Sequence, residues 1–172
     1  QAVNLNPRSQ RWVPDNSYLQ RHVGSAIAHN VWQYFQVTQD VEFLYFYGAE
    51  LILDIACFWS SIASFDDERG RYEIRGVMGP DEFHDGYPDS PTPGLNNNAY
   101  TNITTVWVLC RALEVLDLLS DVRRAELTTR LGLSAEETAR WEDISRKMLV
   151  PFHEDGIISQ FEGYEKLREL DW

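Results

Sequence analysis

Residues 41–62 read VEFLYFYGAELILDIACFWSSI, a largely apolar stretch without proline. Its large hydrophobic side chains recur every three or four residues, which is the spacing that places them on one face of a helix. They are Val41, Leu44, Tyr45, Ile52, Ile55, Trp59 and Ile62. The spacing predicts one long helix here, and such an apolar face needs another element to cover it.

A second predicted helix precedes this one, over residues 22–35. The apolar residues that give it helical spacing are Val23, Ile27, Val31 and Tyr34. Because only residues 37–39 separate the two helices, we expect them to fold back as an antiparallel pair. Thr38 or Asp40 is the expected N-cap of the second helix.

Two more helices are predicted farther along the chain. Helical spacing resumes at Tyr100 and continues to about Ser120. Ser134 and Glu137 then form a capping box that opens a fourth helix, which ends before Pro151.

The segments at both ends of the chain look irregular. Residues 1–20 hold Pro7 and Pro14 among polar residues and read as an extended loop. Residues 152–172 show no helical or strand periodicity. The fold class is therefore all-α, built from helical hairpins joined by loops.

The composition limits the number of domains and the classes of binding partner. A chain of 172 residues with 44% hydrophobic residues has enough apolar material for one domain. Its net charge of -12 would repel nucleic acid and anionic lipid, and an anionic substrate would need a local positive site. No stretch approaches the roughly 18 apolar residues of a membrane span. Two cysteines without a pairing motif fit a cytoplasmic setting. The chain opens on Gln1 and stops at Trp172, so we expect residues 1–172 to be a fragment of a longer chain.

Glycine and proline interrupt residues 66–98 too often for a long helix. They are Gly70, Gly76, Gly79, Pro80, Gly86, Pro88, Pro91, Pro93 and Gly94. A short extended run, residues 72–75, leads into this loop. A loop of this length inside a compact domain is typically functional.

Three titratable side chains follow a turn inside this loop. The dipeptide Gly79-Pro80 favours a fixed turn, and Asp81, Glu82 and His84 come directly after it. A carboxyl group beside another carboxylate and partly desolvated has a raised pKa, which suits a general acid at neutral pH. Proton transfer by Glu82 is the chemistry that this cluster favours.

The residues around the cluster favour a carbohydrate ligand. Asn96, Asn97 and Asn98 supply neutral hydrogen-bond donors and acceptors, and aromatic side chains such as Trp32 and Tyr100 suit the apolar face of a sugar ring. Two plainer interpretations stay open. The acidic loop can be a solvated surface, and the asparagines can simply cap the next helix.

Other chemistries lack their usual sequence support. A metal site made by Asp81, Glu82, His84 and Asp85 would need a calcium-loop or zinc pattern that is absent, so no metal is expected. The chain also lacks a nucleophile elbow, a phosphate-binding loop and a dinucleotide fingerprint.

Two motifs in this region resemble a known family. RGVMGPDEFH at residues 75–84 and NNAYTN at residues 97–102 resemble the catalytic signature of glycoside hydrolase family 65, which includes maltose, trehalose and kojibiose phosphorylases. VWQY at residues 31–34 and TQD at residues 38–40 are also similar to the helix before that signature. The resemblance runs from about residue 22 to residue 150.

The resemblance implies part of an (α/α)6 toroid whose loops form a sugar pocket at one end. Glu82 corresponds to the general acid, which protonates the glycosidic oxygen while inorganic phosphate attacks the anomeric carbon. The reaction converts an α-linked glucose disaccharide into β-glucose 1-phosphate and glucose. Phosphate is then a co-substrate and no cofactor is required.

The resemblance also implies roles for residues around Glu82. They are Asp81, His84, Asn98 and Tyr100 as supporting or sugar-contacting groups, with Trp32 and His22 as further pocket residues. The family's phosphate-binding loop and its other sugar-binding pairs fall outside this chain. The uncovered helix faces of a fragment favour self-association into a homo-oligomer.

Two alternatives to a phosphorylase remain at this point. One is a hydrolase of the same fold, in which a carboxylate outside the chain activates water. The other is a helical carbohydrate-binding domain without catalysis. Neither the disaccharide nor its linkage follows from the sequence.

Overall fold

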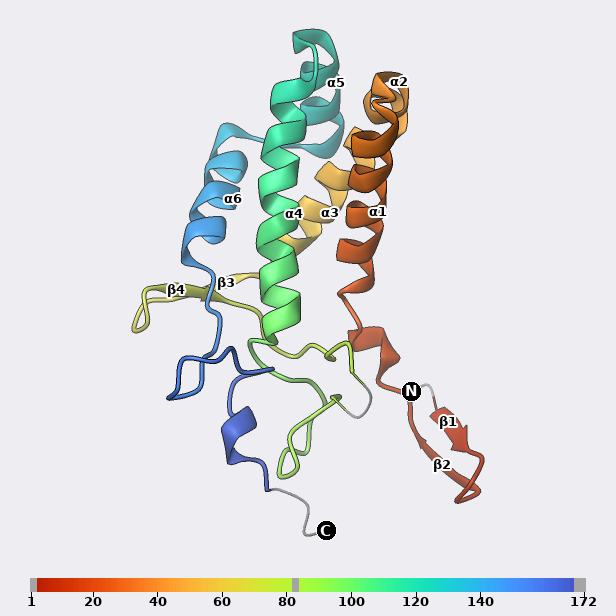
Figure 1. The fold of residues 1–172 in the computed structure, drawn as a ribbon, viewed down its shortest axis with the longest axis vertical. Coiled ribbons are helices and arrows are strands. Elements are labelled where there is room, and N and C mark those ends of the chain that lie inside the picture. The colour runs from red at the N-terminus through yellow and green to blue at the C-terminus, as the bar shows by residue number, and fades with distance from the viewer. Residues whose placement is uncertain (1–2, 82–83, 169–172) are drawn as a thin grey trace.

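The computed structural model describes residues 3–81 and 84–168, and helices dominate it (Figure 1). Helix α1 (Val23–Thr38) is followed by α2 (Val41–Phe43), a π-helical turn η2 (Leu44–Gly48) and α3 (Ala49–Ile62). These last three run without a break and correspond to the helix predicted over residues 41–62. Helices α1 and α3 run in opposite directions (Figure 1), which confirms the predicted antiparallel pair.

The turn between α1 and α2 is closed by Asp40. Gln39, with a left-handed φ of 55°, is the C-cap of α1, and the Asp40 carboxylate accepts a hydrogen bond from the Phe43 amide at 2.9 Å. Asp40 is therefore the N-cap, as one of the two predicted choices. Gly48 lets α3 approach α1 closely, because a Cβ there would lie 3.0 Å from Val31 Cγ1.

The second half of the chain holds helices α4 (Ala99–Leu118), α5 (Asp121–Leu131) and α6 (Ala135–Lys147). The predicted capping box is confirmed in part, because the Ser134 hydroxyl accepts a hydrogen bond from the Glu137 amide at 3.2 Å. Helix α5 was not predicted. It is largely polar and therefore lacks hydrophobic spacing, although Ser120 caps its start and Gly132 ends it with a φ of 65°.

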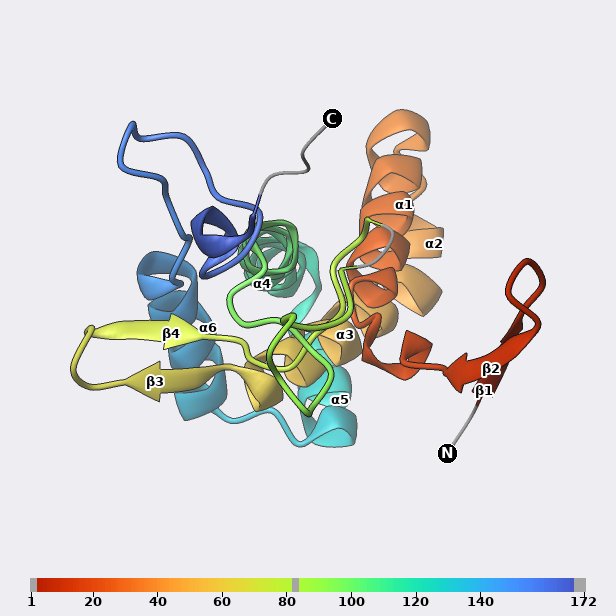
Figure 2. The same ribbon diagram turned by 90° about the horizontal axis from the view of Figure 1, so that it is seen from below.

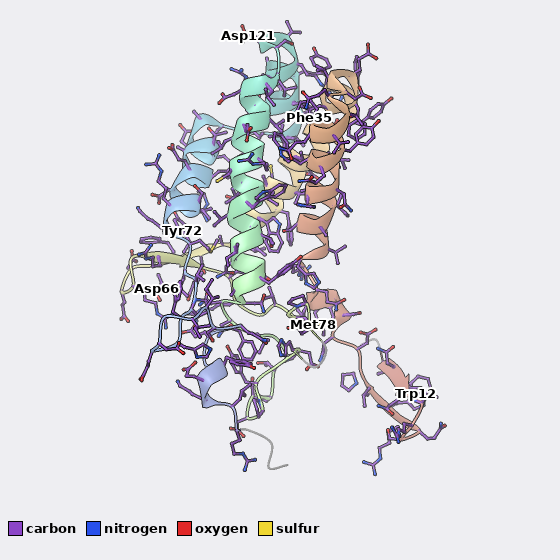
Figure 3. The ribbon with its side chains drawn as sticks, viewed as in Figure 1. Trp12, Phe35, Asp66, Tyr72, Met78 and Asp121 are labelled. Carbon is purple, nitrogen blue, oxygen red and sulfur yellow. The ribbon has the colours of Figure 1, made fainter. Side chains whose placement is uncertain are left out.

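Two small antiparallel sheets accompany the helices, so the fold is mostly helical rather than strictly all-α. Strands β1 (Val3–Asn6) and β2 (Arg11–Pro14) form a hairpin where an extended loop was expected. This hairpin extends away from the helices, as the position of Trp12 in Figure 3 shows. Strands β3 (Ser64–Asp66) and β4 (Arg71–Glu73) form the other, and β4 overlaps the predicted extended run.

The core lies between α1, α3, α4 and α6. Its largest fully buried side chains include Trp59, Trp141, Ile52 and Leu109. Around the α1–α2 corner, in contrast, Val37, Val41, Phe46 and Tyr47 are exposed. The predicted uncovered helix face is therefore present, whereas self-association remains a prediction.

The arrangement of the helices gathers the loops at one end. In Figure 1, α1 and α4 both start at this end, and α3 and α6 both finish there. Figure 2 looks onto the same end and shows the coloured part of the loop after β4 and the segment that follows α6 gathered near the start of α4. In the part of the chain that the structure describes, none of the helices is both long and apolar enough to cross a membrane.

Candidate functional site

A small pocket lies where loop 66–98, the start of α4 and the C-terminal segment meet. It has a volume of about 220 Å³, and we call it the loop pocket. Its lining residues are Pro80, Asp81, His84, Asn98, Ala99, Tyr100, Ile103, Ile158, Ser159 and Gln160. Three segments distant in sequence therefore contribute to it. Larger hollows exist, such as one of about 850 Å³ between residues 87–89 and 162–168, but none of the predicted site residues lines that one.

Glycine makes the tight path of the loop possible. The Gly79 amide donates to the His84 carbonyl at 2.9 Å and closes a turn that contains Asp81. A Cβ on Gly79 would lie 3.0 Å from both Asn98 Nδ2 and His84 Cβ, so only glycine fits without movement. Farther out, Val77 and Leu95 exchange backbone hydrogen bonds of 3.0 and 2.7 Å, which fixes the base of the loop.

Asn98 joins helix α4 to the C-terminal segment. Its side-chain Oδ1 accepts a hydrogen bond from the Thr101 amide at 3.0 Å, and its side-chain Nδ2 donates to the Gln160 backbone carbonyl at 3.3 Å. The side chain is buried, and the residue is 2% exposed. The plainer interpretation, that an asparagine of this run caps the helix, is therefore confirmed for Asn98.

Asn97 holds the loop from inside. It is fully buried in the left-handed region, with a φ of 49°. Its Oδ1 accepts from the Ile74 amide at 3.3 Å and from Asn102 Nδ2 at 3.2 Å, while its own Nδ2 donates to Glu162 at 2.8 Å. A strained backbone at a buried position persists only where such bonds hold it.

Two pairs of side chains involve residues that line the pocket. His84 Nδ1 is 3.8 Å from an Asp81 carboxylate oxygen, which forms an ion pair when the imidazole is protonated. The rings of His22 and Tyr100 meet edge to face with centroids 5.8 Å apart. Asp81 and Tyr100 are exposed, so both are available to a ligand.

The structure brings together most of the predicted site residues. Asp81, His84, Asn98 and Tyr100 line the pocket, and His22 contacts Tyr100. Glu82 lies outside the described residues.

Trp32 is not part of this group. It is 4% exposed in the core and packs against Phe35 with ring centroids 5.6 Å apart. Phe35 lies at the far end of α1 in Figure 3, whereas Met78 lies at the loop end. The Arg111 guanidinium stacks 5.2 Å from the centre of the Trp32 ring.

Sequence reasoning missed Ile158, Ser159 and Gln160, which form one wall of the pocket. They belong to the segment that was read as irregular, and no periodicity marks them.

As for metals, within residues 3–81 and 84–168 no group of three or more His, Cys, Asp or Glu side chains is placed to hold an ion.

Comparison with known proteins identifies similar chains. The model for the glycosyl hydrolase family 65 central catalytic domain matches residues 1–172. An uncharacterized glycosyl hydrolase of Mycobacterium tuberculosis is 57% identical over 172 residues, which cover 100% of this chain and 13% of the relative. Trehalose 6-phosphate phosphorylase of Lactococcus lactis is 37% identical over 172 residues, 100% of this chain and 21% of the relative.

A kojibiose phosphorylase and a solved structure are also similar to this chain. The enzyme of Caldanaerobacter subterraneus is 38% identical over 158 residues, 89% of this chain and 19% of the relative. A solved structure, a putative kojibiose phosphorylase from the human microbiome, matches with a TM-score of 0.72 and 22% identity, over 86% of this chain and 19% of that chain. This chain thus spans about a fifth or less of the length of these relatives.

Proposed function

The chain belongs to glycosyl hydrolase family 65, and we propose that it supplies the general acid of an enzyme that splits an α-linked glucose disaccharide with inorganic phosphate. The observation that carries this proposal is the loop pocket. Asp81 and His84, which flank the Glu82-Phe83 dipeptide in the chain, both line it together with Asn98 and Tyr100. Phosphorylases among the relatives support the same chemistry.

The proposed reaction needs one protein carboxyl group. Glu82 gives its proton to the glycosidic oxygen, and the bond from that oxygen to the anomeric carbon breaks. A phosphate oxygen forms the new bond from the opposite face, so an α-linkage becomes β-glucose 1-phosphate and the other sugar leaves as an alcohol. An inverting hydrolase would instead need a second carboxylate, about 6.5–9.5 Å from the acid, to activate water.

The remaining pocket residues have supporting roles in this proposal. Tyr100 is exposed beside His22 and presents an aromatic face to a sugar ring. Asp81 and His84 contribute polar groups at the mouth, where they hold sugar hydroxyls. Asn98 is occupied by Thr101 and Gln160, so it shapes the pocket wall.

The direction of the helices supports a toroid for the complete domain. Helices α1 and α4 are parallel to each other, and α3 and α6 run the opposite way (Figure 1). Two neighbouring hairpins of an (α/α)6 toroid, with an inner and an outer layer, have this arrangement. We propose that the loop pocket opens at the end of the toroid where the inner helices begin.

A substrate panel tests the proposal. The full-length protein is incubated with maltose, trehalose, kojibiose and trehalose 6-phosphate, with and without inorganic phosphate, and disaccharide consumption is followed. We expect one of the four to be consumed only with phosphate present. Consumption that is independent of phosphate would make the protein a hydrolase, and binding without consumption would make it a carbohydrate-binding protein.

Replacing Asn98 by alanine should affect both stability and substrate binding. The variant loses the N-cap of α4, which costs about 1 kcal/mol, and one of the two bonds to the Gln160 carbonyl. We expect a lower midpoint of thermal unfolding and a KM for the disaccharide raised about tenfold, because the pocket wall at Gln160 loses one of the two hydrogen bonds that hold its carbonyl.

Ser134→Ala is the matched control for this variant. It removes the equivalent cap hydrogen bond from α6, which starts away from the loop end in Figure 1. Its unfolding midpoint should fall by a similar amount while KM stays unchanged. Equal KM values in the two variants would show that Asn98 acts only on helix stability.

A further inference from the structure

The segment from Ser159 to Glu162, whose first two residues line the loop pocket, is held by backbone hydrogen bonds to three neighbouring parts of the chain. The Ser159 amide donates to the Pro151 carbonyl at 2.9 Å, and the Gln160 carbonyl accepts from the Ala99 amide at 2.9 Å. The Glu162 amide donates to the Asn96 carbonyl at 3.1 Å. The segment thus runs beside the start of α4 and forms a fixed edge of the pocket.

Glu162 connects three further parts of the chain at this edge. Its Oε1 accepts from Arg69 at 2.6 Å and its Oε2 accepts from Asn97 at 2.8 Å. Its backbone carbonyl accepts from the Tyr87 hydroxyl at 2.8 Å. Arg69 lies in the turn between β3 and β4, Tyr87 in the middle of loop 66–98, and Asn97 just before the N-cap of α4. Glu162 therefore holds three separate positions along this loop.

The electrostatics of this carboxylate fit a structural anchor. The hydrogen bond from Arg69, with a smaller contribution from Asn97, lowers the pKa of the Glu162 carboxyl against the opposing effect of its partial burial. The Glu162 side chain is 34% exposed. A charge-assisted bond at 2.6 Å in this setting is stronger than a neutral one. The carboxylate also supports the strained backbone of Asn97, whose φ is 49°.

Gln160 lies between these anchors and has a different character. Its backbone carbonyl is fixed by Ala99 and Asn98, yet the residue is exposed and lines the pocket. An amide side chain on an immobilised backbone is well suited to donate to and accept from sugar hydroxyls.

We propose that Gln160 contacts the sugar in the loop pocket and that Glu162 is the positioning residue that holds Gln160 and the start of α4 in place. The assignment rests on the proposed carbohydrate function. It adds that the C-terminal segment forms one wall of the sugar site. In that wall Gln160 is the contact residue, and Glu162, two positions later, holds it in place.

Kinetics of the full-length protein with the disaccharide found in the substrate panel test both roles. Gln160→Ala should raise KM about tenfold with little change in kcat, because one sugar contact is lost. Glu162→Ala should raise KM by a similar factor and should also lower kcat, because both Gln160 and the start of α4 are then less firmly held. Arg69→Ala should behave like Glu162→Ala, whereas Arg69→Lys should keep most of the activity. The double variant Arg69→Ala/Glu162→Ala should be no worse than Glu162→Ala alone, since that single variant has already lost the link to Arg69.

A second measurement does not depend on activity. Hydrogen exchange of the backbone amides at positions 99 and 162 should become at least about tenfold faster in Glu162→Ala, because local opening becomes easier. Glu142→Ala, which removes an exposed ion pair with Arg146 on α6, is the control and should change neither exchange nor KM. Unchanged exchange at Ala99 in Glu162→Ala would overturn the positioning role, and an unchanged KM in Gln160→Ala would overturn the contact. An inactive wild type with accelerated exchange in Glu162→Ala would reject the proposed function alone.

Discussion

Replacing Glu82 by glutamine should lower kcat about 100- to 10,000-fold, the contribution that a positioned general acid makes. The amide has nearly the shape of the carboxyl group but has no proton to give to the departing glycosidic oxygen. Because shape and polarity are kept, KM for the disaccharide should change little. Initial rates of the full-length protein in saturating phosphate measure the effect.

Glu136→Gln provides the control for this substitution. Glu136 is exposed in the first turn of α6, far from the loop end, and the same chemical change there should leave kcat unaltered. An unaltered kcat in Glu82→Gln would show that Glu82 is not the general acid.

Replacing Gly94 by alanine should disorganise the long loop and cost about 3 kcal/mol or more in the free energy of unfolding, from backbone strain and a steric clash together. Gly94 has a φ of 105°, and a Cβ there would lie 2.6 Å from Gly76 Cα and 2.8 Å from Gly76 C. Both contacts are with backbone, so no side chain can move aside. Chemical denaturation measures the loss, and phosphorolysis should fall with it.

Gly132→Ala separates the two causes in this prediction. Gly132 also has a left-handed φ, 65°, but a Cβ there would have nothing within 4 Å. The alanine variant should lose only about 1–2 kcal/mol, the cost of that conformation alone. Equal losses at Gly94 and Gly132 would show that the contact between Gly94 and Gly76 does not constrain the loop.

Sequence patterns predicted the helices that carry the core and missed the elements that do not. Helix α3 buries Ile52 and Trp59 of its predicted apolar face. In α1, by contrast, Val23, Ile27 and Tyr34 are exposed, so their spacing predicted the helix but not the face that it buries. Helix α6 was predicted from its capping box. Helix α5 buries only Arg123 and Leu127, so its spacing carries little signal. The β1–β2 hairpin buries none of its strand residues and was read as a loop for the same reason.

The candidate site was predictable where its residues share one motif. Asp81 and His84 lie in one short turn, and Asn98 and Tyr100 start the helix that follows the loop, so local geometry brings them together. Gln160 is held at the pocket because its carbonyl accepts hydrogen bonds from the Ala99 amide and the Asn98 side chain, more than sixty positions away, which no pattern in the sequence records. Trp32 was misplaced because an aromatic residue on a helix faces the core as readily as a ligand.

Proton NMR of the first glucosyl product formed by the full-length protein tests the central claim most directly. The reaction contains inorganic phosphate and the disaccharide that is consumed. Inverting phosphorolysis predicts that the product is the β-anomer of glucose 1-phosphate, whose anomeric carbon does not mutarotate. Formation of the α-anomer, or of free glucose in place of the phosphate ester, would contradict the account.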